Sequence, residues 1–178
     1  MTGPDGPLVA IGIGNVLLRD DGAGVRVVEA LRGMAARDPG LLPPRTRLVD
    51  GGTLGLALLE PLEGARAALL IDAVNLGLPP GTVIERAGDA VTAGDAPGMH
   101  GLAELVGAAR MLGALPTALA FVGIQVGEID LDLALSPQVA DALPRAVDAA
   151  RRALLALDAQ TGREAVGAPG AHPAGVTR

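Results

Sequence analysis

Residues 8–28 read LVAIGIGNVLLRDDGAGVRVV, and this stretch decides the fold class of the chain. Its first six residues are apolar, as in a buried strand, and a glycine turn follows. From Asp21 to about Ala36 the apolar side chains recur at helical spacing, so a helix should begin directly after the turn. A strand, a glycine turn and a helix in this order are typical of the first unit of a parallel α/β sheet.

The same alternation continues to the end of the folded part. Apolar runs predict further strands over Thr46–Val49, Ala67–Ala73 and Ala118–Ile124, with an edge strand over Gly81–Arg86. Periodic segments predict helices over Leu54–Leu59, Gly101–Leu112 and Pro137 to about Leu157. We therefore predict an α/β fold, a three-layer sandwich in which helices cover both faces of a twisted, mostly parallel, five-stranded sheet.

Prolines and a serine set the expected helix ends. Pro61 should stop the first short helix. Ser136 should cap the last helix, with Pro137 at its first position, and Pro144 should kink or split that helix. Beyond Thr161, glycine, proline and alanine dominate without periodicity. We predict one domain over residues 1–160 and a disordered tail over 161–178.

Composition excludes several classes of function. The net charge is −6 and the basic residues form no dense patch, which argues against nucleic-acid binding. Phe121 is the only aromatic residue, so stacking on bases is unsupported. There is no cysteine, no apparent signal peptide and no apolar run of membrane-spanning length. A cytoplasmic protein without a membrane or nucleic-acid partner is therefore expected.

Acidic residues gather where the predicted parallel strands end. Asp21 follows the first strand, Asp50 ends the second, and Asp72 lies near the end of the third. Carboxyl ends of parallel strands open onto one rim, where ligands bind in such folds. Asp50 is followed by Gly51 and Gly52, which let the backbone approach a ligand closely, although a tight turn would also explain them.

Each candidate residue also has a simpler explanation. Asp20 or Asp21 could cap the following helix, and Asp72 could accept hydrogen bonds from its loop. His100 could be a helix cap, but it is the only histidine in the predicted folded part, because His172 lies in the tail. Two carboxylates and one imidazole suit a divalent transition metal, so Asp21, Asp72 and His100 could share one site.

Two other chemistries fit less well. The turn Gly12–Leu17 lacks the third glycine of a dinucleotide-binding loop, and Asp20 and Asp21 would repel a phosphate. Ser136 is the only serine and is already expected to cap a helix. A hydrolase built on this chain would therefore use water, a carboxylate or a metal.

Taken in order, these motifs resemble the hydrogenase maturation endopeptidases, which process the large subunit of nickel–iron hydrogenases. The matching segments are GIGNVLLRDDGAGV from Gly12, DGGTLG from Asp50, IDA around Asp72, HGL from His100, FVGIQ from Phe121 and LSPQV from Leu135. They extend over nearly the whole predicted folded part, and together their order and spacing are specific.

The resemblance implies a metal-dependent endopeptidase that removes the C-terminal peptide of a nickel-loaded large-subunit precursor. It implies that Asp21, Asp72 and His100 form a nickel site, with Asp21 and Asp72 also catalytic. Some relatives carry glutamate at the position of Asp21, and Asp20 is a fallback ligand. The implied supporting residues are Asn15, Asp20, Asp50, Gly51 and Gly52.

The resemblance also implies that the Ni²⁺ is largely presented by the precursor, and that Zn²⁺ or Cd²⁺ can occupy the same site. A monomer is expected. The alternatives are a non-catalytic nickel-binding module, an inactive relative, or another hydrolase on this scaffold. Peptidyl-tRNA hydrolase shares a G-x-G-N turn, but that chemistry needs a histidine near the turn, and the first 99 residues contain none.

Overall fold

The computed structural model describes residues 6–88, 91 and 100–167, with the side chains of 100–101 and 163–167 left out. The strands are β1 Leu8–Ile13, β2 Thr46–Gly52, β3 Ala67–Val74, β4 Val83–Ala87 and β5 Ala118–Gln125. The helices are η1 Arg19–Gly22, α1 Ala23–Arg37, η2 Gly55–Leu58, α2 Leu59–Leu62, α4 His100–Met111 and α5 Pro137–Gly167. The predicted strands are therefore all present.

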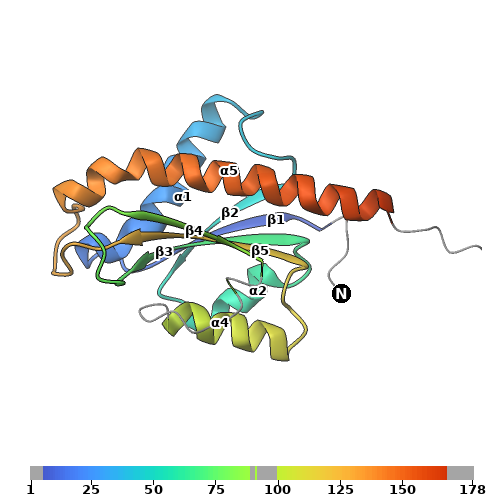
Figure 1. Cartoon of the computed structure of the whole chain (residues 1–178), viewed down its shortest axis with the longest axis horizontal. Helices are drawn as coiled ribbons and strands as arrows, with labels where there is room; N and C mark the ends of the chain where they lie inside the picture. Colours follow the sequence, from blue (N-terminus) through green and yellow to red (C-terminus); the bar gives the residue numbers. More distant parts are fainter. Residues whose placement is uncertain (1–5, 89–90, 92–99, 168–178) are drawn as a thin grey trace, which may run out of the picture.

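The five strands form one sheet in the order β2-β1-β3-β5-β4. β1 pairs in parallel with β2 and β3, and β3 pairs in parallel with β5. Only β4 runs antiparallel, at the edge beside β5, which confirms the predicted edge strand. Crossover helices return the chain so that β1, β2, β3 and β5 end on the same side of the sheet (Figure 1).

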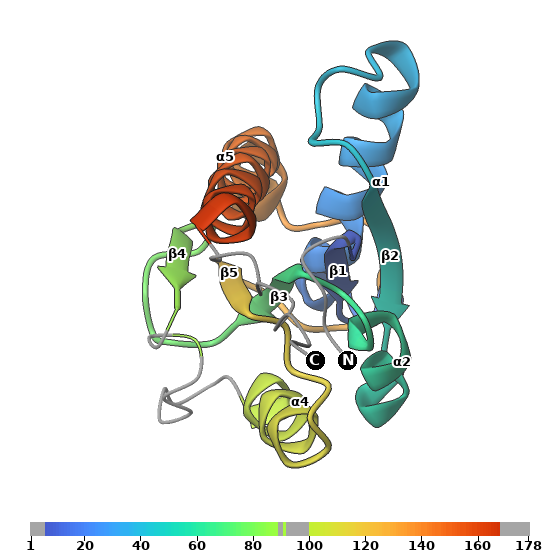
Figure 2. The ribbon, with the colours of Figure 1, turned by 90° about the vertical axis from the view of Figure 1, so that its right-hand side faces the viewer.

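Helices cover both faces, as predicted for a three-layer sandwich (Figure 2). One core layer packs α1 and α5 against alternate strand residues such as Leu69 and Val122. The other packs α2 and α4 against the intervening residues, including Leu70 and Phe121. The central strands β3 and β5 are apolar on both faces because both are covered. None of the helices in the described ranges has the length and apolarity that crossing a bilayer demands.

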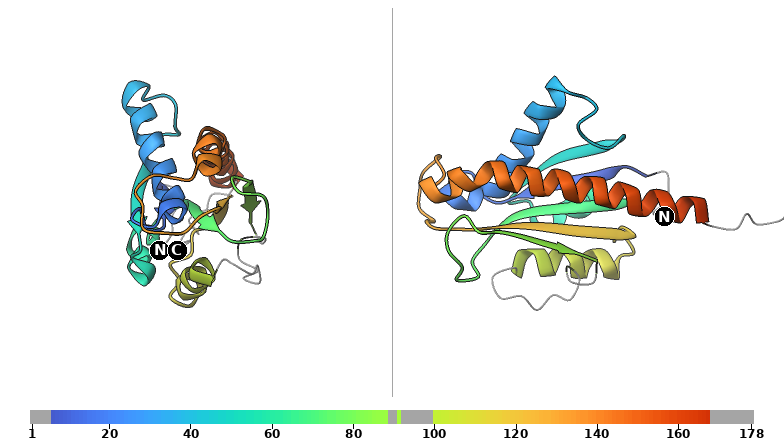
Figure 3. Two further views of the ribbon diagram at one scale, coloured as in Figure 1. Left: turned by 90° about the vertical axis from the view of Figure 1, so that its left-hand side faces the viewer. Right: turned by 45° about the horizontal axis from the view of Figure 1, so that its top comes forward.

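The structure differs from the predicted helix ends at three places. Pro61 lies inside α2, where a first-turn proline removes no helical hydrogen bond. Pro144 does not split α5, which runs as one long helix beside the sheet (Figure 3). That helix also continues past Leu157 to Gly167, so part of the segment expected to be a tail is helical. The disorder predicted for the rest lies outside the described residues.

An internal ion pair explains why α5 continues. Arg66, just before β3, is buried and donates to Asp158 (2.5 Å) and Thr161 (2.8 Å) on the last turns of the helix. Its Nε also donates to the carbonyl of Gly6 (3.1 Å). A buried guanidinium needs these acceptors, and together they hold the end of α5 against the start of the sheet.

Candidate functional site

The turn after β1 brings the start of α1 against the sheet. Gly14 has a φ of +127°, and a Cβ on it would lie 1.8 Å from the carbonyl oxygen of Asp21. Likewise, a Cβ on Gly24 would lie 2.3 Å from the carbonyl oxygen of Ile71 in β3. Larger residues would separate these backbones, so the glycines fix the position of Asp21 relative to the ends of β1 and β3.

Asp21 is held by the turn that precedes it. The backbone N–H of Asn15 donates to Asp21 Oδ2 over 2.8 Å, while Asn15 Oδ1 accepts from the N–H of Leu17 (3.0 Å). Asn15 therefore shapes the turn with its side chain and orients Asp21 with its backbone. Neither Asp20 nor Asp21 caps the helix, as their positions before it had suggested, because no side-chain cap bond is present at the start of η1 or α1.

Gly12 of β1 lies opposite Asp50 of β2 on one side and Ile71 of β3 on the other, and Asp72 is the next residue along β3. Burial raises the pKa of Asp72 to about 7, although the N–H of Ala73 lowers it, and the negative charge of Asp21 raises it further. No arginine in the described part of the chain forms a salt bridge with Asp72. The two carboxylates thus lie close enough to interact, at the predicted rim. A carboxyl group that titrates near neutral pH can exchange protons or bind a cation.

Asp50 reaches the same rim on the far side of β1. β1 separates β2 from β3, so the backbones of Asp50 and Asp72 are about 10 Å apart. Asp50 Oδ1 accepts the N–H of Gly52 (3.1 Å), and a Cβ on Gly51 would lie 2.8 Å from the side chain of Ile11. Asp50, Gly51 and Gly52 thus form a tight turn beside the two acids, which favours a supporting role.

Asp20 has a role that its local sequence does not indicate. Its side chain is fully buried and accepts from the N–H groups of Gly127 (2.9 Å), Glu128 (2.8 Å) and Ser136 (2.7 Å) and from the Ser136 hydroxyl (2.7 Å). Burial alone would raise the pKa of Asp20, but these hydrogen bonds outweigh it and hold the pKa below its usual value.

This network corrects the prediction that Asp20 caps α1 and gives Ser136 a further partner. Asp20 does not cap α1, and with both oxygens occupied it is poorly suited to be a fallback metal ligand. Ser136 does precede α5, but its hydroxyl donates to Asp20 across the fold. Asp20 therefore anchors the loop over residues 127–136, whereas Asp21 faces the rim.

His100 is the first residue of α4. α4 runs antiparallel to β5, so it begins on the side where the parallel strands end (Figure 1). The side chain of His100 lies outside the described residues. Within the ranges that the structure describes, no three histidine, cysteine, aspartate or glutamate side chains come together as a metal site. The grouping of His100 with Asp21 and Asp72 therefore stays a prediction.

A positioning residue that sequence reasoning left out is Gln125, the last residue of β5. Its buried side chain accepts through Oε1 from the N–H groups of Leu76 (2.8 Å) and Leu78 (3.4 Å). These bonds hold the loop that follows Asp72. The available signal was an amide residue at the end of an otherwise apolar strand, where a buried polar group needs partners.

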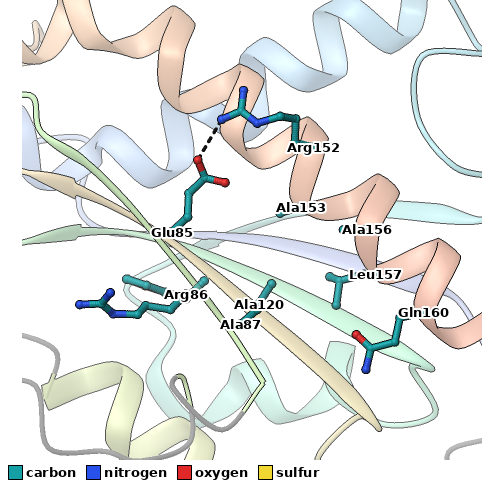
Figure 4. A pocket seen from close by; sticks show the side chains of 10 residues that line it. Glu85, Arg86, Ala87, Ala120, Arg152, Ala153, Ala156, Leu157 and Gln160 are labelled. Atoms are coloured by element: carbon teal, nitrogen blue, oxygen red, sulfur yellow. Dashed lines mark hydrogen bonds and ion pairs between the residues drawn. The ribbon is translucent and has the colours of Figure 1, made fainter.

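A separate cavity of about 300 Å³ lies between α5 and the edge of the sheet (Figure 4). Its lining is mostly apolar, with Ala120, Ala153 and Leu157 among its residues. The charged Glu85 and Arg152 of its lining pair with each other over 2.9 Å. The cavity is near the amino-terminal half of β5, away from Asp21 and Asp72, so we assign it no part in the site.

Comparison with known proteins gives a consistent result. Residues 25–153 match the family model described as hydrogenase maturation protease. The chain is 37% identical over 155 residues to hydrogenase expression/formation protein HupD of Rhodobacter capsulatus, covering 84% of this chain and 71% of that protein. It is 32% identical over 137 residues to the hydrogenase 2 maturation protease of Escherichia coli, covering 74% of this chain and 80% of that one.

Solved structures show the same similarity. The hydrogenase maturating endopeptidase HybD of E. coli superposes with a TM-score of 0.71 at 29% identity, covering 86% of this chain and 93% of that one. The [NiFe] hydrogenase maturation protease HybD of Thermococcus kodakarensis superposes with a TM-score of 0.67 at 24% identity, covering 83% and 99%. The predicted fold is confirmed by these superpositions and by the observed sheet.

Proposed function

The chain belongs to the hydrogenase maturation protease family, and from that premise we propose that it removes the C-terminal peptide of a nickel-loaded nickel–iron hydrogenase large-subunit precursor. Family membership makes an endopeptidase the preferred reading over a non-catalytic nickel-binding module or a peptidyl-tRNA hydrolase. The nickel in this proposal arrives as part of the substrate.

The observation that carries the proposal is the pairing of Asp21 with Asp72 at the rim. Burial and the like charge of Asp21 raise the pKa of Asp72 to about 7. A cation between two such carboxylates would relieve their repulsion and favour their ionised forms. The free protein thus offers an incomplete, negatively charged set of oxygen ligands, which suits a metal that another protein already holds.

We propose that Asp21, Asp72 and His100 together supply ligands to the nickel of the precursor. Hard carboxylates with one imidazole would bind free nickel weakly, so the site would respond mainly to nickel already coordinated by the precursor. Zn²⁺ or Cd²⁺ could occupy the same ligands in vitro. We assign supporting roles to the residues that hold this rim in place: Asn15, Asp20, Asp50, Gly51 and Gly52.

Peptide hydrolysis needs a base to take a proton from water. Asp21 and Asp72 are the proposed groups, each when it is not engaged as a ligand. Asp72 is suited to this task because a pKa of about 7 lets it accept and return a proton near neutral pH. The nickel of the substrate would supply the specificity check and could polarise the scissile carbonyl.

The test is a cleavage assay on nickel-loaded and nickel-free precursor from the same organism. Wild-type protein should cleave the loaded precursor only. His100→Ala should lose at least about 100-fold in kcat/KM, because it removes a ligand from the proposed nickel contact. His172→Ala, which changes the other histidine, is the matched control and should behave as wild type.

Each alternative result has a distinct meaning. Cleavage of the nickel-free precursor at the same rate would refute nickel recognition. Undiminished activity of His100→Ala would remove that residue from the site while leaving the protease. Failure of the wild type to cleave its cognate precursor in either form would contradict the proposed function itself.

A further inference from the structure

Exposed hydrophobic residues are concentrated at the rim that carries the candidate site. Ten large hydrophobic side chains are exposed among the described residues, and seven of them lie in the segments that directly follow the parallel strands. These seven are Leu17, Leu54, Leu56, Leu78, Ile129, Leu131 and Leu133. A single exposed leucine needs no explanation, but a group around one site is typical of an interaction surface.

The clearest part of this surface is the loop over residues 128–133, which reads EIDLDL. Its acidic and apolar residues alternate, and the acids turn toward Arg19. Arg19 Nε lies 3.2 Å from Glu128, and Arg19 Nη1 lies 3.4 Å from both Asp130 and Asp132. The intervening apolar side chains point to solvent: Ile129 is 54% exposed, Leu131 85% and Leu133 63%. Leu17 joins them, because its carbonyl accepts the N–H of Asp132 (3.2 Å). We call these four residues the apolar ridge.

The loop that carries the apolar ridge is anchored along its length. Asp20 binds its first residues and Ser136 beyond its end, as described above. The N–H of Arg19 donates to the carbonyl of Asp132 (2.9 Å), and Asp132 Oδ1 accepts the N–H of Ala134 (3.0 Å). An anchored backbone cannot easily turn these side chains inward, and a prearranged apolar surface loses little entropy when a partner binds.

The charge beside the apolar ridge indicates the chemistry of the partner. Three carboxylates face one guanidinium, which leaves an excess of negative charge, and Glu128, Asp130 and Asp132 keep about half of their side-chain surface exposed. Asp20, the chain neighbour of the candidate ligand Asp21, holds the loop, and Leu17 lies two residues after Asn15, whose N–H binds Asp21 (2.8 Å), so the ridge lies on the same rim as the candidate site. An apolar segment with basic residues beside it would match both features.

We propose that the apolar ridge is the docking surface for the large-subunit precursor and receives an apolar segment of that protein flanked by arginine or lysine. This inference rests on the proposed function and adds to it the place and chemistry of substrate recognition. The ridge binds the precursor away from the scissile bond, so it contributes to substrate affinity without contacting the reacting atoms.

The test compares two multiple variants. Ile129→Ser/Leu131→Ser/Leu133→Ser removes most of the ridge and leaves Arg19 and its acids in place. Met111→Ser/Leu112→Ser is the matched control, because Met111, the last residue of α4, is 89% exposed and Leu112, just after it, is 71% exposed. We expect the ridge variant to raise KM for the loaded precursor at least about 10-fold with kcat within about twofold of wild type. The control should change neither, and both variants should keep the wild-type Tm. Added salt should also raise the wild-type KM.

Three results would overturn the docking proposal: an unchanged KM in the ridge variant, a loss confined to kcat, or a wild-type dimer in sedimentation that becomes monomeric in the variant. The last would show that the ridge binds a second copy of the chain. Calorimetric titration of the precursor separates the two proposals. If the wild type binds the precursor but does not cleave it, the proposed function fails, and the docking surface is then refuted only if the ridge variant binds equally well.

Discussion

Replacing Asp72 by asparagine should stabilise the metal-free protein at neutral pH, while abolishing cleavage. The physical reason is the raised pKa of Asp72, about 7 against 3.8 for an unperturbed carboxyl group. The folded state therefore binds a proton more tightly than the unfolded state does. The contribution of protonated Asp72 to the free energy of unfolding is fully present below pH 3.8. It falls as the pH rises toward 7 and is lost above that pH.

The magnitude follows from the shift. About three pKa units correspond to an upper limit of roughly 4 kcal/mol at pH 8. Asp72 is only partly buried, so solvent screening reduces the expected gain of Asp72→Asn to ~1–3 kcal/mol, or about 3–10 °C in Tm for a chain of this size. Asparagine has nearly the same shape and can still accept the N–H of Ala73 through its carbonyl oxygen.

Urea unfolding of both proteins in the presence of a chelator, at pH values from 5 to 8, measures this difference. The gain should grow between pH 5 and 7 and then level off. The exposed residue Asp141 provides the control: Asp141→Asn should show no comparable rise over this range. A difference between Asp72→Asn and wild type that is independent of pH, or a less stable variant at pH 8, would refute the argument that ionised Asp72 destabilises the folded protein.

Three further substitutions test how the site is held. Gly14→Ala should destabilise the fold by ~2–4 kcal/mol and lower kcat/KM at least about 100-fold, because a Cβ there meets the Asp21 backbone. Gly64→Ala is the control, since Gly64 also has a positive φ but no atom lies near the position of its Cβ. This control should lose only about 1 kcal/mol of stability and keep its cleavage activity. Asp20→Asn should cost ~2–4 kcal/mol in urea unfolding at pH 7, since an amide group must face hydrogen-bond donors; a change below about 0.5 kcal/mol would contradict its anchoring role. Arg66→Met should destabilise the protein by ~1–3 kcal/mol and speed hydrogen exchange at the end of α5 while kcat stays unchanged, and unaltered exchange would argue against the anchor.

Local sequence predicted the parts of the fold that local physics determines. Apolar runs located every strand, and the prolines before Val83 marked β4 as an edge strand. Local sequence did not predict the anchoring role of Asp20 or the extension of α5 to Gly167, and the reason is the same for both. The partners of Asp20 lie 107–116 residues away in the chain, and the partners of Arg66 on α5 lie 92 and 95 residues away. Spacing along the chain carries no sign of such contacts.

The sequence also predicted the position of the candidate site, but not the separate roles of Asp20 and Asp21. The rule that ligands bind beyond the carboxyl ends of parallel strands brought Asp21, Asp50 and Asp72 to one rim, where the structure has them. The sequence did not separate Asp20 from Asp21, because adjacent acids before a helix look equivalent until the loop over residues 127–136 is in place. The metal-ligand roles of Asp21, Asp72 and His100 remain predictions.

The anchoring of Asp20 has a consequence for the newly made chain. A ribosome releases the turn that carries Asp20 and Asp21 long before it releases Ser136, and β4 before β5, the strand with which β4 pairs. Until the chain has emerged as far as Ser136, Asp20 lacks the donors that it binds in the folded protein, and until β5 has emerged, β4 lacks the strand with which it pairs. The rim can therefore be completed only late in translation, so an incomplete chain would not present a finished protease site.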